Sequence, residues 1–295
     1  MGRFKNKMAD GLDLYSPPEI AGKVEHLGVT KANLAFGQLA ALAAMAGAFI
    51  ALGGIFYFVV VSDVKGGYGV QQLLGGVVFT LGLLLCSVAG AELFTGNNLL
   101  SIALASGKIS WKGLLRNWAT VWFFNGVGAV LIALIAFYAE HWAGGGNLVG
   151  AKALYTGASK AALPPLTIFF KAILCNVLVC LASWLGYAGR TVTDKLFGMV
   201  LPVAAFVAAG FEHSVANMFF IPYAMLLKGN PKLVELSGLA PTTLHYLSAS
   251  GLLKNLTFAT LGNIVGGAVM VGLMYWAIYL RHDGAPVSHQ EKKAV

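Results

Sequence analysis

Two glutamates, Glu92 and Glu212, interrupt two long apolar stretches of the chain in similar sequence settings. With histidine counted as neutral, residues 66–107 carry Glu92 as their one charged residue, and residues 196–227 carry Glu212 in the same way. A carboxylate within an apolar stretch of membrane-spanning length is costly and indicates function. Glycine and other small residues surround both glutamates. The pattern therefore predicts two interrupted membrane helices that meet near the middle of a bilayer.

The composition supports a membrane fold, because 58% of the residues are hydrophobic and only 11% are charged. Soluble domains carry about 25% charged residues. Several charge-free runs reach the ~18 residues that indicate a membrane-spanning helix. We therefore expect an all-α membrane protein with six transmembrane helices, of which the second and fifth are interrupted. The expected helices cover residues 34–61, 71–106, 114–139, 164–188, 195–228 and 251–280.

Other classes of protein are less consistent with the sequence. The net charge of +8 does not indicate nucleic-acid binding, because the basic residues lie in short loops. The three cysteines have no metal-ligand spacing. The chain also lacks a phosphate-binding loop, a dinucleotide fingerprint and a nucleophile elbow. We expect no metal, no cofactor and no enzymatic activity.

The distribution of lysine and arginine predicts the orientation in the membrane. These residues concentrate in the N-terminal segment, in two loops around 107–116 and 189–195, and in the C-terminal tail. The positive-inside rule then places both termini in the cytoplasm. We expect a cytoplasmic segment at 1–33, a transmembrane domain at 34–281 and a cytoplasmic tail at 282–295.

The N-terminal segment contains a second feature. Its residues 17–31 begin with two prolines and place apolar side chains at helical spacing. Proline is well tolerated at the start of a helix. We predict an amphipathic helix that lies along the membrane surface, either as an anchor or as a gate.

The two halves of the membrane domain resemble each other. A leucine pair, a basic residue and an asparagine begin the third span at residues 114–117 and the sixth span at 252–255. At the same spacing beyond these motifs, Asn125 matches Asn263. We predict two repeats, at about 34–139 and 164–280. Because each has three spans, the second must be inverted in the bilayer.

The helix breaks carry the residues best suited to bind an ion. An opened helix exposes N–H groups that attract an anion. Thr95 adds a hydroxyl group near one break, and His213 adds an imidazole near the other. A small monovalent anion would therefore meet several donors and one titratable group. For Glu92 and Glu212 we favour a structural role in capping the opened ends, because a carboxylate repels an anion.

Two lysines and four large apolar residues are further candidates. Lys171 either extends to the interface or gives an outer vestibule a positive potential, and Lys160 is a weaker candidate on the same side. The apolar residues beside the breaks form either ordinary core or pore constrictions. These apolar candidates are Phe79, Leu83, Leu93 and Phe206.

Four segments resemble signature motifs of the formate–nitrite transporter family. They are residues 91–97, 174–182, 210–218 and 262–267. The resemblance implies an aquaporin-like protomer that assembles as a homopentamer in a bacterial inner membrane, with one pore in each protomer. It also implies transport of formate, nitrite or hydrosulfide and an N-terminal helix linked to pH-dependent gating. The implied pathway residues are Thr95, His213, Asn176 and Asn263, with constrictions at Phe79, Leu83, Leu93 and Phe206.

Formate is the first choice of cargo, because the segments 14–21 and 275–281 look most like formate channels. Residues 169–176 are closer to the nitrite branch, so nitrite and hydrosulfide remain alternatives. Proton coupling at His213 is a further hypothesis. A membrane-embedded enzyme or a non-transporting scaffold is an alternative of another class, as is a water channel.

Overall fold

The computed structural model describes residues 13–281, all of which are helical or irregular. The expected cytoplasmic tail at 282–295 and the first twelve residues lie outside this range. Five helices are long and apolar enough to cross a membrane. Four of them are α3 (Phe36–Val61), α4 (Gly67–Val88), α6 (Trp111–Tyr138) and α8 (Pro165–Ala188). The fifth is a continuous rod formed by α13 (Ala249–Ile264), η3 (Val265–Leu273) and α14 (Met274–Tyr279), which corresponds to the sixth expected span.

The second and fifth spans are interrupted, as the sequence predicts. The second consists of α4, η1 (Gly96–Leu99) and α5 (Leu100–Ala105), and the fifth of α9 (Val192–Ala208) and α10 (Ser214–Leu227). α4 and α9 end in the same way, because Gly90 and Gly210 adopt positive φ angles of 83° and 65°. This left-handed conformation is a common helix stop, and glycine adopts it without steric cost.

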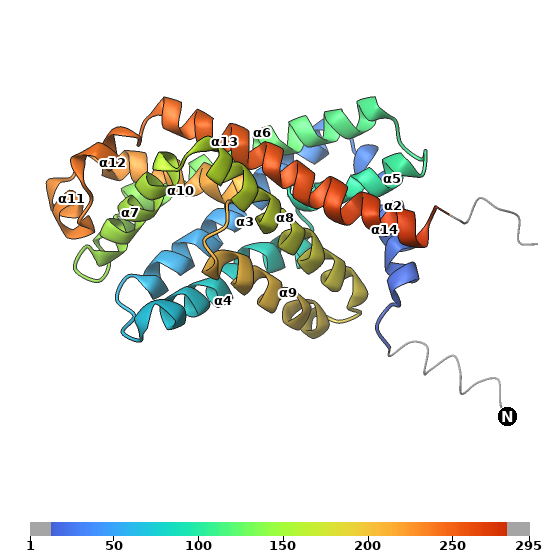
Figure 1. Ribbon diagram of the computed structural model, residues 1–295, viewed down its shortest axis with the longest axis horizontal. Helices are drawn as coiled ribbons and strands as arrows, with labels where there is room; N and C mark the ends of the chain where they lie inside the picture. Colours follow the sequence, from blue (N-terminus) through green and yellow to red (C-terminus); the bar gives the residue numbers. More distant parts are fainter. Residues whose placement is uncertain (1–12, 282–295) are drawn as a thin grey trace, which may run out of the picture.

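Short helices that the sequence did not reveal lie in the connection between the two halves and between the fifth and sixth spans. α7 (Leu148–Ala162) is the longest of them, and α11 (Pro231–Ser237) and α12 (Pro241–His245) lie near it. In Figure 1 these three helices form the left end of the molecule. α7 packs against α10, so it belongs to the helical bundle. It is therefore not a simple surface loop.

The N-terminal helix α2 (Pro17–Ala32) forms where it is expected, but its apolar face packs against protein. Ile20, Val24 and Gly28 are buried, and α5 and α8 are among its neighbours. A Cβ atom on Gly28 would lie 2.9 Å from the Cβ atom of Ala103 on α5, which shows how closely the two helices approach. The apolar face is thus covered by protein, and the position of α2 along the membrane surface stays a prediction.

Corresponding helices in the two halves pack in the same way. α3 contacts α4 and α6, and α8 contacts α9 and α13. Glycines make both close approaches possible: a Cβ atom on Gly128 would lie 1.9 Å from the Ala44 carbonyl oxygen, and one on Gly266 would lie 2.2 Å from that of Ile173. Small residues are the usual means by which membrane helices pack closely. The inversion of one half relative to a bilayer stays a prediction.

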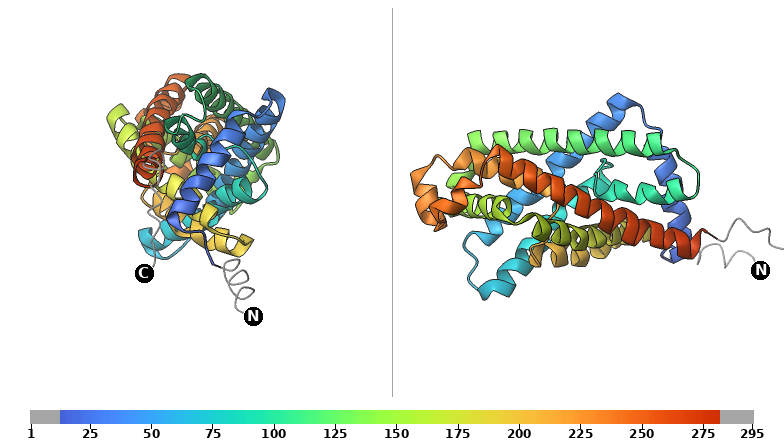
Figure 2. Two further views of the ribbon diagram at one scale, coloured as in Figure 1. Left: turned by 90° about the vertical axis from the view of Figure 1, so that its right-hand side faces the viewer. Right: turned by 45° about the horizontal axis from the view of Figure 1, so that its top comes forward.

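The two ends of the described chain lie together. α2 contacts α14, and both are at the right end of the molecule in Figure 1, opposite α7. α4 and α9 lie side by side below the bundle in the same view. Figure 2 shows α6 and the rod of α13, η3 and α14 extending along the length of the molecule. The helix breaks thus lie between two ends of the molecule, one of which carries α2 and the other α7.

Candidate functional site

Thr95 and His213, predicted separately from the two breaks, are in direct contact. The Thr95 hydroxyl oxygen lies 3.0 Å from Nε2 of His213. Both residues are buried. Thr95 precedes η1 and His213 precedes α10, so each stands at the first turn after a break. The two interrupted spans therefore meet at a hydrogen bond between their polar side chains.

A backbone contact fixes the role of the imidazole. Nδ1 of His213 accepts a hydrogen bond of 2.9 Å from the backbone N–H of Ala216, so His213 is the N-cap of α10. In the neutral ring, one nitrogen accepts and the other carries the proton. The proton is then on Nε2, which donates to the Thr95 hydroxyl oxygen. The Thr95 hydroxyl keeps its own hydrogen for another acceptor.

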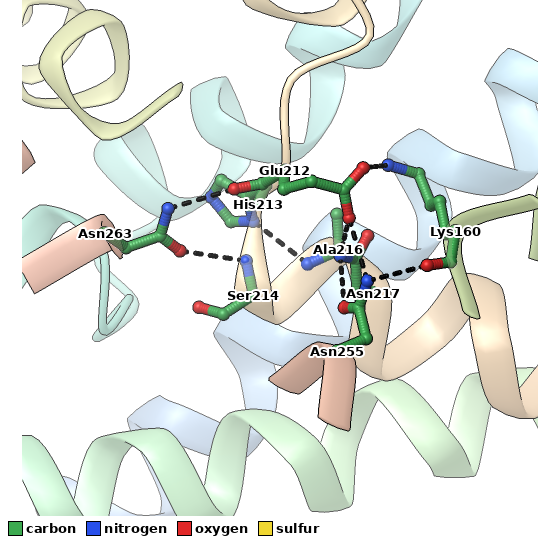
Figure 3. A network of polar contacts seen from close by, with 8 residues as sticks. All are labelled: Lys160, Glu212, His213, Ser214, Ala216, Asn217, Asn255 and Asn263. Carbon is green, nitrogen blue, oxygen red and sulfur yellow. Dashed lines mark hydrogen bonds and ion pairs between the residues drawn. The ribbon is translucent and has the colours of Figure 1, made fainter. Parts of the chain in front are cut away.

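Asn263 forms hydrogen bonds with the backbone at the break of the fifth span (Figure 3). Its side-chain oxygen accepts from the backbone N–H of Ser214 at 2.9 Å. Its amide nitrogen donates to the carbonyl oxygens of Glu212 and Ala172 at 3.0 Å and 2.9 Å. Backbone groups freed at membrane depth must find such partners, because no lipid atom can replace them. Asn263 therefore stabilises the opened backbone.

Asn125 makes the corresponding contacts in the first half. Its side-chain oxygen accepts from the Phe94 N–H at 2.9 Å. Its amide donates to the carbonyl oxygens of Glu92 and Ala43 at 2.9 Å and 2.7 Å. The match between Asn125 and Asn263 in the sequence thus reflects a shared structural task at the two breaks.

Glu212 forms a buried ion pair with Lys160 of α7. Its Oε1 lies 2.7 Å from the lysine nitrogen, and its Oε2 accepts from Asn217 at 2.7 Å and Asn255 at 3.0 Å. The four residues come from three helices and from the break itself, as Figure 3 shows. With these partners the carboxylate is neutralised and well bonded, which is the condition for burying a charge.

Glu92 has an equivalent set of partners in the first half. Lys31 of α2 lies 3.1 Å from Oε1, and Asn97 donates to Oε2 at 2.7 Å. Asn117 accepts from Asn97 at 3.0 Å and donates to the Lys31 carbonyl oxygen at 3.1 Å. α2 and α7 therefore supply corresponding lysines to the two breaks.

Two cavities approach the Thr95–His213 contact. The α7 cavity, which we define by Lys160, Glu212, His213, Phe79 and Phe206, has a volume of about 480 Å³. Lys152 and Lys171 also line it, and both side chains are partly exposed. Neither has a carboxylate within ion-pair distance among residues 13–281. The cavity therefore has an excess of positive charge.

The α2 cavity, defined by Lys31, Glu92, Leu83, Leu93 and Asn97, has a volume of about 230 Å³. It is lined by residues different from those of the α7 cavity. The two cavities correspond to the two halves of the chain, since each contains one lysine–glutamate pair.

The four apolar candidates lie beside the cavities in two pairs. Phe79 and Phe206 line the α7 cavity and contact each other edge to face, with ring centroids 6.1 Å apart. The Phe206 ring also stacks on His213 at 5.9 Å. Leu83 and Leu93 line the α2 cavity. All four side chains are buried, so each cavity is lined by one apolar pair.

Three of the pathway candidates do not line the cavities. Thr95, Asn176 and Asn263 are fully buried and are absent from the lining of both. Sequence reasoning also missed Lys31, Asn97 and Asn217 as partners of the glutamates. The sequence contains a signal for the lysines. Lys31 precedes Ala43 by the same number of residues as Lys160 precedes Ala172, so the two lysines occupy corresponding positions in the two halves.

Burial also affects a charged group outside the spans. Lys152 of α7 is partly buried, and desolvation lowers the pKa of its amine below the ordinary lysine value. Its ring contact is with Tyr155, at 5.8 Å from the amine nitrogen to the ring centroid.

The sequence model of the family described as "Formate/nitrite transporter" matches residues 18–277. The chain belongs to this family. The formate channel FocA of Escherichia coli strain K12 is 40% identical over 281 residues, which cover 94% of this chain and 99% of FocA. The probable formate transporter of Methanothermobacter thermautotrophicus is 38% identical over 288 residues, covering 92% of this chain and 99% of that protein.

Solved structures agree with the assignment to the formate/nitrite transporter family. A structure described as a pentameric formate channel with formate bound matches with a TM-score of 0.76 and 40% identity, over 83% of this chain and 98% of that one. A structure described as an FNT family ion channel matches with a TM-score of 0.72 and 31% identity, over 88% and 98%. Members of this family are channels and transporters and not enzymes, so the predicted class of protein and the all-helical membrane fold are confirmed, while the inverted repeat stays a prediction.

Proposed function

We propose that this protein is a membrane channel for small monovalent anions, with formate as its cargo. The observation that carries the proposal is the Thr95–His213 hydrogen bond at the meeting point of two broken helices, with one apolar pair lining the cavity in each half. Relatives that are 38–40% identical over nearly their whole length are described as formate channels or transporters. Nitrite and hydrosulfide are the competing cargoes.

The geometry suggests how an anion is held and passed. The excess positive charge of the α7 cavity raises the local anion concentration. The Thr95 hydroxyl, whose oxygen accepts from His213 Nε2–H, then supplies its own hydrogen as a donor at the centre. A bare anion is strongly disfavoured beside the apolar pairs, because unpaired charge is costly in a low-dielectric setting. Transfer of a proton to the anion from a protonated His213, or from water through the ring, would leave the neutral imidazole and produce a neutral acid, which passes these pairs at much lower cost.

His213 is the residue through which the proposal is tested. We expect His213→Asn to change the pH dependence of formate uptake into proteoliposomes, because asparagine supplies a donor but cannot exchange a proton near neutral pH. At the pH of maximal wild-type uptake, the rate should fall at least tenfold, in the range typical for loss of an acid–base group. Stopped-flow uptake across a pH series measures both effects.

Two comparisons make this experiment decisive. Uptake of nitrite and hydrosulfide by the same wild-type sample tests the cargo, and faster uptake of either one would replace formate. His245→Asn is the control, because His245 lies on α12, outside both cavities. A His213→Asn protein with the wild-type pH profile would remove proton exchange at His213 from the mechanism.

The proposal includes the assembly and the orientation. A structural relative is described as a pentamer, and exposed large apolar side chains on α4, α6 and α9 give this chain surfaces suited to lipid or to neighbouring subunits. We place the protein in a bacterial inner membrane, with both termini on the cytoplasmic side. The positive-inside rule supports this, and so does the contact between α2 and α14 at one end of the molecule.

A further inference from the structure

The two halves differ at the positions that matter for the Thr95–His213 contact. By the spacing that matches the two glutamates, Leu93 corresponds to His213 and Val215 corresponds to Thr95. Each half therefore supplies one polar residue where the other half has an apolar one. A third difference lies on α8, where Asn176 corresponds to Gly47 of α3 by the spacing that relates Lys31 to Lys160.

Asn176 donates to the backbone around the first break. Its amide nitrogen lies 3.3 Å from the Thr95 carbonyl oxygen, 3.1 Å from the side-chain oxygen of Asn98 and 2.7 Å from the Asn263 carbonyl oxygen. These three neighbours are all acceptors, so the nitrogen must face them. The Thr95 carbonyl also accepts from the Cys180 thiol at 3.4 Å. Two donors from α8 thus fix this one peptide group.

The opposite helix provides the space for Asn176. A Cβ atom on Gly267 of η3 would lie 2.3 Å from the Asn176 amide nitrogen. In the first half the arrangement is exchanged: Gly47 is the small residue, and Ala129 stands at the position that corresponds to Gly267. A Cβ atom on Gly47 would lie 1.9 Å from the Asn125 carbonyl oxygen, so no side chain fits there. Of the two corresponding positions, 47 and 176, only position 176, beside the Thr95 carbonyl, has room for an asparagine.

We infer that Asn176 is a positioning residue: by holding the Thr95 carbonyl, it directs the Thr95 hydroxyl to His213. The hydroxyl oxygen is attached two bonds from the Thr95 Cα atom, so rotation of the freed peptide group would move it away from Nε2. Asn176 lines neither cavity and acts on the Thr95–His213 hydrogen bond through the Thr95 backbone. Its consequence for transport rests on the proposed function, but its effect on His213 does not.

The first test is independent of transport. In protein with ¹⁵N-labelled histidine, the Nε2 resonance of His213 is assigned by its absence from His213→Asn. We expect Asn176→Ala to shift this resonance in the same direction as Thr95→Val, and the double variant to shift it no further than Thr95→Val alone. Cys175→Ala is the matched control, because Cys175 is a buried neighbour on α8 whose loss leaves only a packing defect. Its Nε2 resonance should stay at the wild-type position.

The second test uses formate uptake across a pH series. Asn176→Ala should change the pH profile in the direction of Thr95→Val, with at least a threefold fall in rate at the wild-type optimum. If the alanine variant folds poorly, Asn176→Leu, which keeps the branching at Cγ but has no donor, should give the same change. An unshifted Nε2 resonance in both Asn176 variants would overturn the inference. Absence of formate uptake by the wild type would overturn the proposed function and leave the resonance test decisive.

Discussion

At the scale of single residues, each lysine–glutamate pair neutralises a buried carboxylate at one of the two helix breaks. The Lys160 side chain is 16% exposed and that of Glu212 only 1%, so water screens this pair weakly. Two asparagines complete the bonding of the carboxylate. Removing one member of a buried pair leaves an uncompensated charge, whereas removing both charges does not.

We therefore predict that Lys160→Met lowers the free energy of unfolding by about 3 kcal/mol. The double variant Lys160→Met/Glu212→Gln should recover most of this loss, because the glutamine is neutral and close in shape to glutamate. Thermal unfolding in detergent provides the measurement. Lys171→Met serves as the control, since Lys171 lines the same cavity without a carboxylate partner in the described chain. Equal stability of Lys160→Met and the wild type would contradict the prediction.

At the scale of helices, close backbone packing determines where the break of the second span can lie. Asn125 of α6 reaches both Ala43 of α3 and the opened backbone at Phe94. This reach depends on the near approach of α3 and α6, which Gly128 permits one turn further along. A wider spacing would leave the freed N–H and C=O groups without partners.

Gly128→Ala should therefore cost roughly 3 kcal/mol, the upper part of the range for overpacking, and reduce the yield of folded protein. The new Cβ atom would lie 1.9 Å from the backbone oxygen of Ala44, which cannot move by side-chain rotation. Gly126→Ala on the same helix is the matched control, because its nearest neighbour is the flexible Met218 side chain at 3.5 Å. Size-exclusion profiles and thermal unfolding of both variants check the prediction; similar profiles would disprove it.

At the scale of the whole molecule, the α7 cavity contains positive charge that is unpaired within residues 13–281. The lysine–glutamate pairs are close to neutral, so the excess positive charge of the α7 cavity comes from Lys152 and Lys171. Under the proposed function, an anion that enters from the α7 end would pass both lysines. Attraction of this kind acts over a Debye length of about 10 Å at 0.1 M salt and weakens as the ionic strength rises.

We predict that Lys152→Gln/Lys171→Gln lowers formate uptake roughly two- to tenfold at low ionic strength and much less in about 1 M of a non-permeant salt. Stopped-flow uptake at the two ionic strengths measures the effect. Lys254→Gln is the control, because Lys254 begins α13 outside the cavity. A loss of uptake that is equal at low and high salt would show that the two lysines act through contact with the anion or through structure, and not through long-range attraction.

The sequence by itself determined the class of fold, the two breaks and the residues beside them. Apolar runs, the glutamates and the glycines that end α4 and α9 are local signals, and each can be read without knowing what packs against it. Thr95 and His213 were found for the same reason. The repeat of Asn125 and Asn263 was also visible, although its purpose at the breaks was not.

Only the tertiary structure decided how these residues are joined. The hydrogen bond between Thr95 and His213 links the second span to the fifth, and the partners of Glu92 and Glu212 come from α2 and α7. Such contacts depend on the distance and rotation of packed helices, which sequence spacing does not fix. For the same reason the sequence did not reveal that Asn176 and Asn263 bind the backbone that the breaks leave open, and their place in a transport pathway stays a prediction.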